Sequence, residues 1–246
     1  MRTPRLKLAA GAPPGRRRWG TLFTAVADVT RMVHRDLTRR VETDMPTYPG
    51  DPPVSVAPHA TVEADGYRVA AVECGTHAGT HVDAPSHTEP DGRTIDEFPV
   101  GTFAFDARLV DLRGRDPRAA VRPEDLPETD AGMVVLRTGW AERWGEPSYF
   151  DHPYLSRAAA EHCAERGYHV ATDGASVDPS PSGTDAATAA EPDGVPAHRA
   201  LLGAERLIVE NLTNLDGLPD RFELRAYPLR IAGGDGAPAR AVAVTP

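Results

Sequence analysis

The chain has 246 residues, 40% of them hydrophobic and 26% charged, which is the composition of an ordinary globular domain. Its net charge of −9 argues against a nucleic-acid partner, because phosphate contacts need clustered cations. No apolar run approaches the roughly 20 residues that cross a bilayer, so no membrane partner is expected. Two cysteines in so long a chain predict a reducing, cytoplasmic location.

The chain begins with a basic segment that differs from the rest of the sequence. Residues 1–20 carry several Lys and Arg side chains and no acid, and glycine and prolines interrupt their apolar stretch. That interruption argues against a secretory signal, whose apolar core runs about 7–15 residues. We expect residues 1–32 to form a disordered or loosely packed tail, and residues 33–246 to form one domain. A basic patch for an anionic partner is the alternative role of this tail.

Short apolar runs rich in β-branched residues follow, separated by Pro, Gly and Asp. Runs of this kind predict strands. The predicted strands fall within residues 68–75, 107–114, 133–139, 169–174, 206–212 and 239–244.

Two helices are expected between these strands. Residues 154–167 have Ser156 as an N-cap and Gly167 as a stop, and residues 196–205 begin at a proline. Residues 179–194 hold turn-forming and small residues without periodicity, which predicts a surface excursion or a mobile flap. Because helices and strands do not alternate regularly, we expect one β-rich α/β domain and not a doubly wound parallel sheet.

Three histidines and an aspartate lie close together at His77, His81, Asp83 and His87. Gly79 and Pro85 oppose a helix across this segment, so its backbone is expected to be extended or turning. All four positions are odd, and in an extended chain their side chains would share one side. Imidazole nitrogens and carboxylate oxygens are ligands of borderline divalent cations. The alternative is that these are exposed polar residues of a loop.

This spacing suggests separate roles within the cluster. His77, His81 and Asp83 would provide three ligands and leave a coordination position for water. His87 would be a further ligand or a proton carrier beside the metal. Glu210 lies inside an apolar run, where a carboxylate is costly unless it is paired or bound to a cation. His198 lies at the start of the second predicted helix, and its imidazole could meet the Glu210 carboxylate. The alternative is that Glu210 faces solvent on an edge strand.

Residues 77–87, in the pattern His-x-Gly-Thr-His-x-Asp-x-Pro-x-His, resemble the signature of the metal-dependent cyclase family, which includes bacterial kynurenine formamidases and isatin hydrolases. Residues 36–54, 136–140, 209–219 and 227–244 also resemble segments of that family. The resemblance implies a swivelling β/β/α fold, a homodimer or homotetramer, and one or two Zn²⁺ or Mn²⁺ ions per subunit. The residues that match the family's metal ligands are His77, His81, Asp83, His87, His198 and Glu210.

The resemblance implies a metal-dependent hydrolase that attacks an amide, lactam or ester bond of a small aromatic substrate, with His87 and Glu210 in catalytic roles. From residue type alone, Tyr48, Phe98 and Trp140 are candidates for the wall of the substrate site. Two alternatives stay open, a metal-dependent cyclase or dehydratase acting on a biosynthetic intermediate and a non-catalytic metal-binding protein. The sequence contains no Gly-x-Ser-x-Gly elbow, Walker A loop or His-Glu-x-x-His motif.

Overall fold

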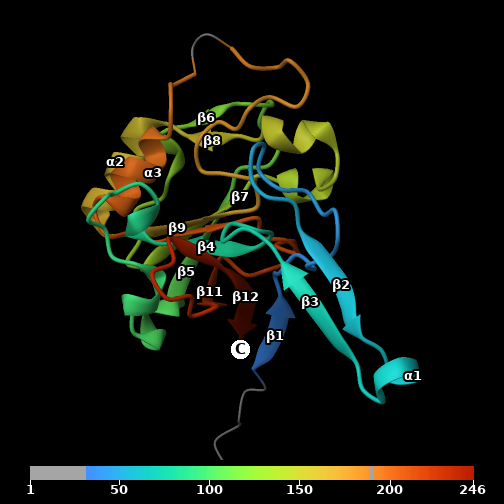
Figure 1. Ribbon diagram of the computed structural model, residues 1–246. Helices are drawn as coiled ribbons and strands as arrows, with labels where there is room; N and C mark the ends of the chain where they lie inside the picture. The colour runs from blue at the N-terminus through green and yellow to red at the C-terminus, as the bar shows by residue number, and fades with distance from the viewer. Residues whose placement is uncertain (1–31, 189–190) are drawn as a thin grey trace, which may run out of the picture. The chain divides into compact units, whose positions relative to one another are not determined.

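Seven strands close into a ring in which each strand is hydrogen-bonded to two neighbours (Figure 1). The computed structural model describes residues 32–188 and 191–246. In spatial order the ring strands are β12 (Gly236–Thr245), β11 (Arg221–Pro228), β5 (Ala104–Asp111), β7 (Met133–Arg137), β9 (His169–Thr172), β10 (Ile208–Glu210) and β4 (His81–Asp83). A further strand, β1 (Val33–Asp36), pairs with β12 outside the ring. The predicted tail lies outside the described residues except for Met32.

Parallel and antiparallel pairing divide the ring into two parts. Strands β5, β7, β9 and β10 are parallel to one another, and all other pairings in the ring are antiparallel. The short strand β4 joins β10 to β12 and so completes the ring. The predicted β-rich α/β domain is therefore confirmed, and the parallel strands belong to a closed barrel instead of a doubly wound open sheet.

Alternation along the strands creates two hydrophobic cores. Met133 and Val135 of β7 belong to the cluster that fills the barrel interior. Val134 and Leu136, which alternate with them, belong to a second cluster on the outer side. Because side chains of a strand point alternately to opposite faces, a strand covered on both faces needs a continuous apolar run. Residues 133–136 of β7 are accordingly all apolar and buried.

Two helices cover the outer side of the parallel strands (Figure 1). Helix α2 (Arg157–Arg166) is capped by the Ser156 hydroxyl, which accepts a hydrogen bond from the Ala159 amide at 3.2 Å. It ends at Gly167 with φ 78°. Helix α3 (Pro196–Leu202) begins at its proline as predicted and ends before Gly203.

The helix predicted over residues 154–167 begins later in the structure, at Arg157. Tyr154–Leu155 forms the short strand β8, which pairs with β6 (Ala120–Val121). The N-cap residue itself has extended backbone, so the two residues before Ser156 can still pair as a strand.

A hairpin outside the barrel accounts for the first predicted strand. Strands β2 (Ser55–Ala60) and β3 (Val69–Glu73) pair with each other, and the single-turn helix α1 (Val62–Asp65) lies at the tip (Figure 1). Every residue of β3 is exposed, so this apolar run is a strand without being part of a core. Within the described residues, no helix has the length and apolar character needed to cross a membrane.

Candidate metal centre

The barrel strands place three polar side chains on the outer side of the ring. Val82, between His81 and Asp83 on β4, packs into the barrel interior, so its two neighbours point outward. On β10 the same alternation puts Val209 inside and Glu210 outside. The register pairs Glu210 with His81 across the two strands. Two separate chain segments thus bring an imidazole and a carboxylate side by side.

The other histidines come from a turn, a short helix and α3. His77 lies in the turn before β4, where Gly79 adopts φ 63°, and His87 ends the 3-10 helix Pro85–His87. The expectation of an extended or turning backbone is confirmed: His81 and Asp83 lie on a strand, and the left-handed glycine and the proline turn the chain on either side of it. Helix α3 brings His198 over the same site.

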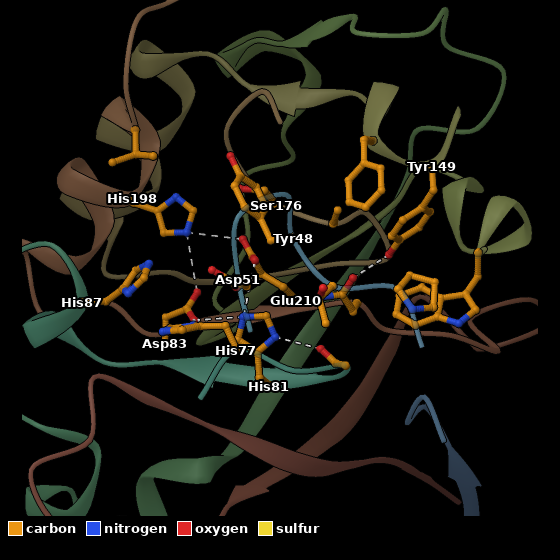
Figure 2. A pocket seen from close by; sticks show the side chains of 18 residues that line it. Tyr48, Asp51, His77, His81, Asp83, His87, Tyr149, Ser176, His198 and Glu210 are labelled. Carbon is orange, nitrogen blue, oxygen red and sulfur yellow. Dashed lines mark hydrogen bonds and ion pairs between the residues drawn. The ribbon is translucent and has the colours of Figure 1, made fainter. Parts of the chain in front are cut away.

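These side chains converge around Asp83 (Figure 2). Its Oδ1 lies 2.8 Å from His77 Nδ1 and 3.1 Å from His81 Nε2. Its Oδ2 lies 3.7 Å from His198 Nε2. Glu210 completes the arrangement, with Oε2 3.5 Å from His81 Nε2 and Oε1 3.4 Å from His198 Nε2.

The chemistry of this cluster fits a divalent cation. Three groups of three donors are close enough to share an ion: His77 with His87 and Asp235, His77 with His81 and Asp83, and Asp83 with His198 and Glu210. Asp83 belongs to the last two groups, and its Oδ2 is buried without a hydrogen-bond partner. A buried carboxylate oxygen without a partner is costly unless a cation or a proton compensates it. Imidazole and carboxylate together suit zinc and similar metals.

The pKa values of the cluster reflect its concentration of opposite charges. Burial alone would lower the pKa of His77, but hydrogen bonds to Asp235 and Asp83 outweigh burial and raise it to about 10. Burial also opposes the ionised form of Asp83, yet the surrounding histidines hold the pKa of this carboxyl well below its usual value. For His198, the carboxylates of Asp178, Asp83 and Glu210 overcome burial and raise the pKa well above 6.5. A metal ion would have to displace these protons in order to bind.

Neighbouring polar groups fix the orientation of the candidate ligands. Asp178 accepts hydrogen bonds from the Ala197 and His198 amides, each at 2.9 Å, and its Oδ2 lies 2.8 Å from His198 Nδ1. His81 Nδ1 lies 2.8 Å from the Gly79 carbonyl oxygen, and the Val177 amide donates to Glu210 at 2.9 Å. Such partners set the tautomer and ring orientation of a metal-binding histidine. Sequence reasoning missed Asp178, which stands beside a run of turn formers.

A cavity of about 190 Å³ opens onto this cluster. Tyr48 lines it, as do Trp144, Tyr149 and Phe150. Tyr149 lies across the cavity from the histidines in Figure 2. All six candidate metal ligands border the same space.

Trp140 and Phe98 are absent from the lining in the described part of the chain. Trp140 is 5% exposed and donates its indole N–H to the Ser148 carbonyl at 3.1 Å. Phe98 packs beside Phe103 and lies under the guanidinium of Arg93. The sequence shows which residues are aromatic but not which of them face the cavity. Trp144, Tyr149 and Phe150 are placed there by the 3-10 turns of residues 140–151.

Fold and site together define a β-rich α/β protein with a histidine–carboxylate centre on the outside of a closed barrel. The comparison with protein families then identifies the chain as a member of the cyclase family. The model of that family, described as "Putative cyclase", matches residues 35–179.

Individual relatives agree with this assignment. A kynurenine formamidase of Salinibacter ruber is 34% identical over 216 residues, which cover 84% of this chain and 95% of that protein. The structure of isatin hydrolase A from Ralstonia solanacearum has a TM-score of 0.77 and 25% identity, and covers 87% of this chain and 92% of its own. A protein of Bacillus stearothermophilus described as a predicted metal-dependent hydrolase has a TM-score of 0.69. It is 23% identical, with 87% and 98% coverage, and shows the fold alone.

Proposed function

We propose that this protein is a metal-dependent hydrolase that cleaves the C–N bond of an amide or lactam, or an ester bond, in a small aromatic substrate. The convergence of His81, Asp83, His198 and Glu210 at the wall of an aromatic cavity carries the proposal. The names of the relatives, kynurenine formamidase and isatin hydrolase, support an amide or lactam over other carbonyl substrates.

The candidate ligands suit Zn²⁺ or Mn²⁺, with one or two ions per subunit. His77, His81 and Asp83 would hold one ion, and Asp83, His198 and Glu210 would hold a second. His87, at the edge of the cluster, is available as a further ligand. A bound ion of this kind acidifies water and polarises a carbonyl oxygen.

His87 is the candidate proton carrier. Its side chain is 32% exposed, and its ring lies 4.1 Å from that of His77 and 5.6 Å from that of His198 between centroids. It therefore reaches both the ligand cluster and the open cavity. In hydrolysis His87 would take a proton from the attacking water and return it to the leaving nitrogen.

Glu210 is the second candidate catalytic group. The Val177 amide holds its Oε1 at 2.9 Å, which fixes the carboxylate toward the two buried histidines. Within the site, Glu210 would orient the nucleophilic water or accept its proton. Tyr48, Trp144, Tyr149 and Phe150 would hold the substrate's ring against the centre, since aromatic rings bind well in apolar cavities.

The test combines metal analysis with a substrate panel. Protein stripped with a chelator and reloaded with Zn²⁺ or Mn²⁺ should release formate from N-formylkynurenine or a ring-opened acid from isatin, whereas the stripped protein should not. Aryl esters and secondary-metabolite precursors complete the panel. Turnover that is independent of metal, or ring closure without hydrolysis of any member, would contradict the proposed reaction.

We also propose a homodimer or homotetramer in the cytoplasm. Val62, Tyr67, Val69 and Val72 of the hairpin are 41–60% exposed, and a second copy of the chain would cover such an apolar surface. The absence of disulfides is in keeping with a reducing compartment, because Cys74 and Cys163 are both free. Light scattering of the purified chain, compared with the Val72→Asp variant, tests the assembly.

A further inference from the structure

Asp235 stands between two histidines of the site, and the proposed reaction gives it no task. Its Oδ2 lies 3.0 Å from His77 Nε2 and 3.2 Å from His87 Nδ1. The sequence shows it only as an aspartate in a glycine-rich run, 158 residues beyond His77. The described structure places it at the same edge of the barrel, one residue before β12 begins.

The two ring nitrogens of His77 face different carboxylates. Nδ1 lies 2.8 Å from Asp83 Oδ1, on the side of the candidate metal ligands, and Nε2 faces Asp235. A neutral imidazole that binds a metal through one nitrogen carries its proton on the other. Asp235 is therefore placed to accept the Nε2–H hydrogen bond, which would leave Nδ1 free for an ion.

The same oxygen sets the tautomer of His87. When His87 Nδ1–H donates to Asp235, the lone pair of the neutral ring lies on Nε2. This is the nitrogen that a proton carrier would use. One carboxylate oxygen thus orients both a candidate ligand and the candidate proton carrier.

The backbone around Asp235 is built to hold this position. Its carbonyl accepts a hydrogen bond from the Ala84 amide at 2.9 Å, and Gly236 pairs with Asp83 in the ladder between β12 and β4. A Cβ on Gly236 would lie 2.8 Å from both His77 Cε1 and the Val82 carbonyl oxygen. Only glycine therefore lets the His77 ring pack against the start of β12.

We propose that Asp235 is a positioning residue, which fixes the tautomer and ring orientation of His77 and His87 at once. Its effect on His77 concerns metal affinity and needs no particular substrate. Its effect on His87 rests on the proposed function. The two effects can be measured separately.

The experiment compares Asp235→Asn and Asp235→Ala with the matched control Asp96→Asn. Asp96 anchors the same loop by accepting the Gly233 amide hydrogen bond at 3.0 Å, and its other side-chain hydrogen bond in the described structure comes from the Thr94 hydroxyl. Affinity for Zn²⁺ is measured by competition with a chelator, and the visible spectrum of the Co²⁺-loaded protein reports the coordination geometry. Thermal unfolding of the metal-free proteins shows whether each variant is folded.

We expect Asp235→Ala to bind Zn²⁺ about 10–100-fold more weakly, as loss of a partner that orients a ligand does elsewhere. Asp235→Asn, of the same shape, should show an intermediate loss, and both should shift the Co²⁺ spectrum while Asp96→Asn does not. Affinity and spectra within twofold of the parent in both folded variants would overturn the proposal. So would the loss of one whole ion per chain with unchanged affinity for the rest, because Asp235 would then itself be a ligand.

If the proposed hydrolysis is also correct, kcat should fall in the Asp235 variants saturated with metal while KM changes little. An inactive parent protein would refute the proposed function and leave the metal-affinity result to decide the role of Asp235 at His77.

Discussion

Two buried clusters of this protein handle carboxylate charge in opposite ways. In the first cluster Arg118 pairs with Asp151 at 3.2 Å and with Glu191, which lies in the segment after β9. All three side chains are at most 11% exposed. The hydroxyls of Ser182 and Thr184 donate to Asp151 as well. In the candidate metal centre, by contrast, the side chains that pair with Asp83 and Glu210 are histidines.

The difference separates a structural cluster from a candidate functional one. A guanidinium is permanently charged, so the Arg118 cluster is complete as the chain folds. In the candidate metal centre the carboxylates are paired with histidines, which can release protons, and Asp83 Oδ2 has no hydrogen-bond partner. A cluster of this second kind can exchange protons for a divalent ion.

The largest effect should come from removing the carboxylate that belongs to two of the three donor groups. Asp83→Asn keeps the shape of the side chain but removes its charge, so we expect metal content to fall to background and activity to fall by more than about 100-fold. His81→Ala should behave alike. Elemental analysis and turnover measure both effects, with His59→Ala, on the exposed hairpin, as the control. Full metal content in both ligand variants would remove the basis of the assignment.

Breaking the other cluster should cost stability without affecting metal binding. Arg118→Met leaves Asp151 and Glu191 buried and unpaired, which we expect to lower the free energy of unfolding by about 3–5 kcal/mol. Arg166, which pairs with Glu128 on the surface, supplies the control, since Arg166→Ala should cost about 1 kcal/mol or less. Urea titration gives both values. A loss of metal in folded Arg118→Met would show that the two clusters are not independent.

A smaller effect is expected from a histidine that belongs to neither cluster. His169 accepts a hydrogen bond from the Leu207 amide at 2.8 Å, and burial lowers its pKa to about 4. His169 is therefore protonated near pH 6.5 in the unfolded chain but only near pH 4 in the folded chain. The stability present above pH 6.5 should decline by at most about 3 kcal/mol as the pH falls to 4.

His169→Phe should flatten the pH dependence of unfolding between pH 6.5 and 4, and it should retain the metal. Denaturant titrations at several pH values compare this variant with the parent. An unchanged slope would mean that groups other than His169 dominate the pH response in this range.

The smallest effect should follow deletion of residues 1–20. These residues precede the family match, which begins at residue 35, and both clusters lie beyond residue 76. Metal content, turnover and urea midpoint should all equal those of the full chain within error. A loss of activity on deletion would give the basic segment a role that its composition does not predict.

Local patterns predicted most of the barrel but not its closure. The apolar runs at 107–114, 133–139, 169–174 and 239–244 are strands because each buries at least one face. Strand β11 (Arg221–Pro228) alternates Phe222, Leu224 and Ala226 inward with polar residues outward, which is a weaker sequence signal than a continuous apolar run. The join of β4 to β12 is a pairing over more than 150 residues, which no local pattern encodes.

The candidate site divides in the same way. The six candidate ligands could be named because their spacing and the buried glutamate are visible in the sequence, and the structure brings them together. Their roles as ligands stay a prediction. Asp178 and Asp235 could not be found, since each is a single aspartate among turn-forming residues and only the folded chain sets it against a histidine.

Strand β4 is both the last connection of the barrel and the carrier of His81 and Asp83. Its three residues are short for a barrel strand, so few backbone hydrogen bonds hold the seam on either side. An ion bound between β4 and β10 would act as a clasp across that seam, and the amide protons of residues 81–83 should then exchange with solvent far more slowly in the loaded protein than in the stripped one.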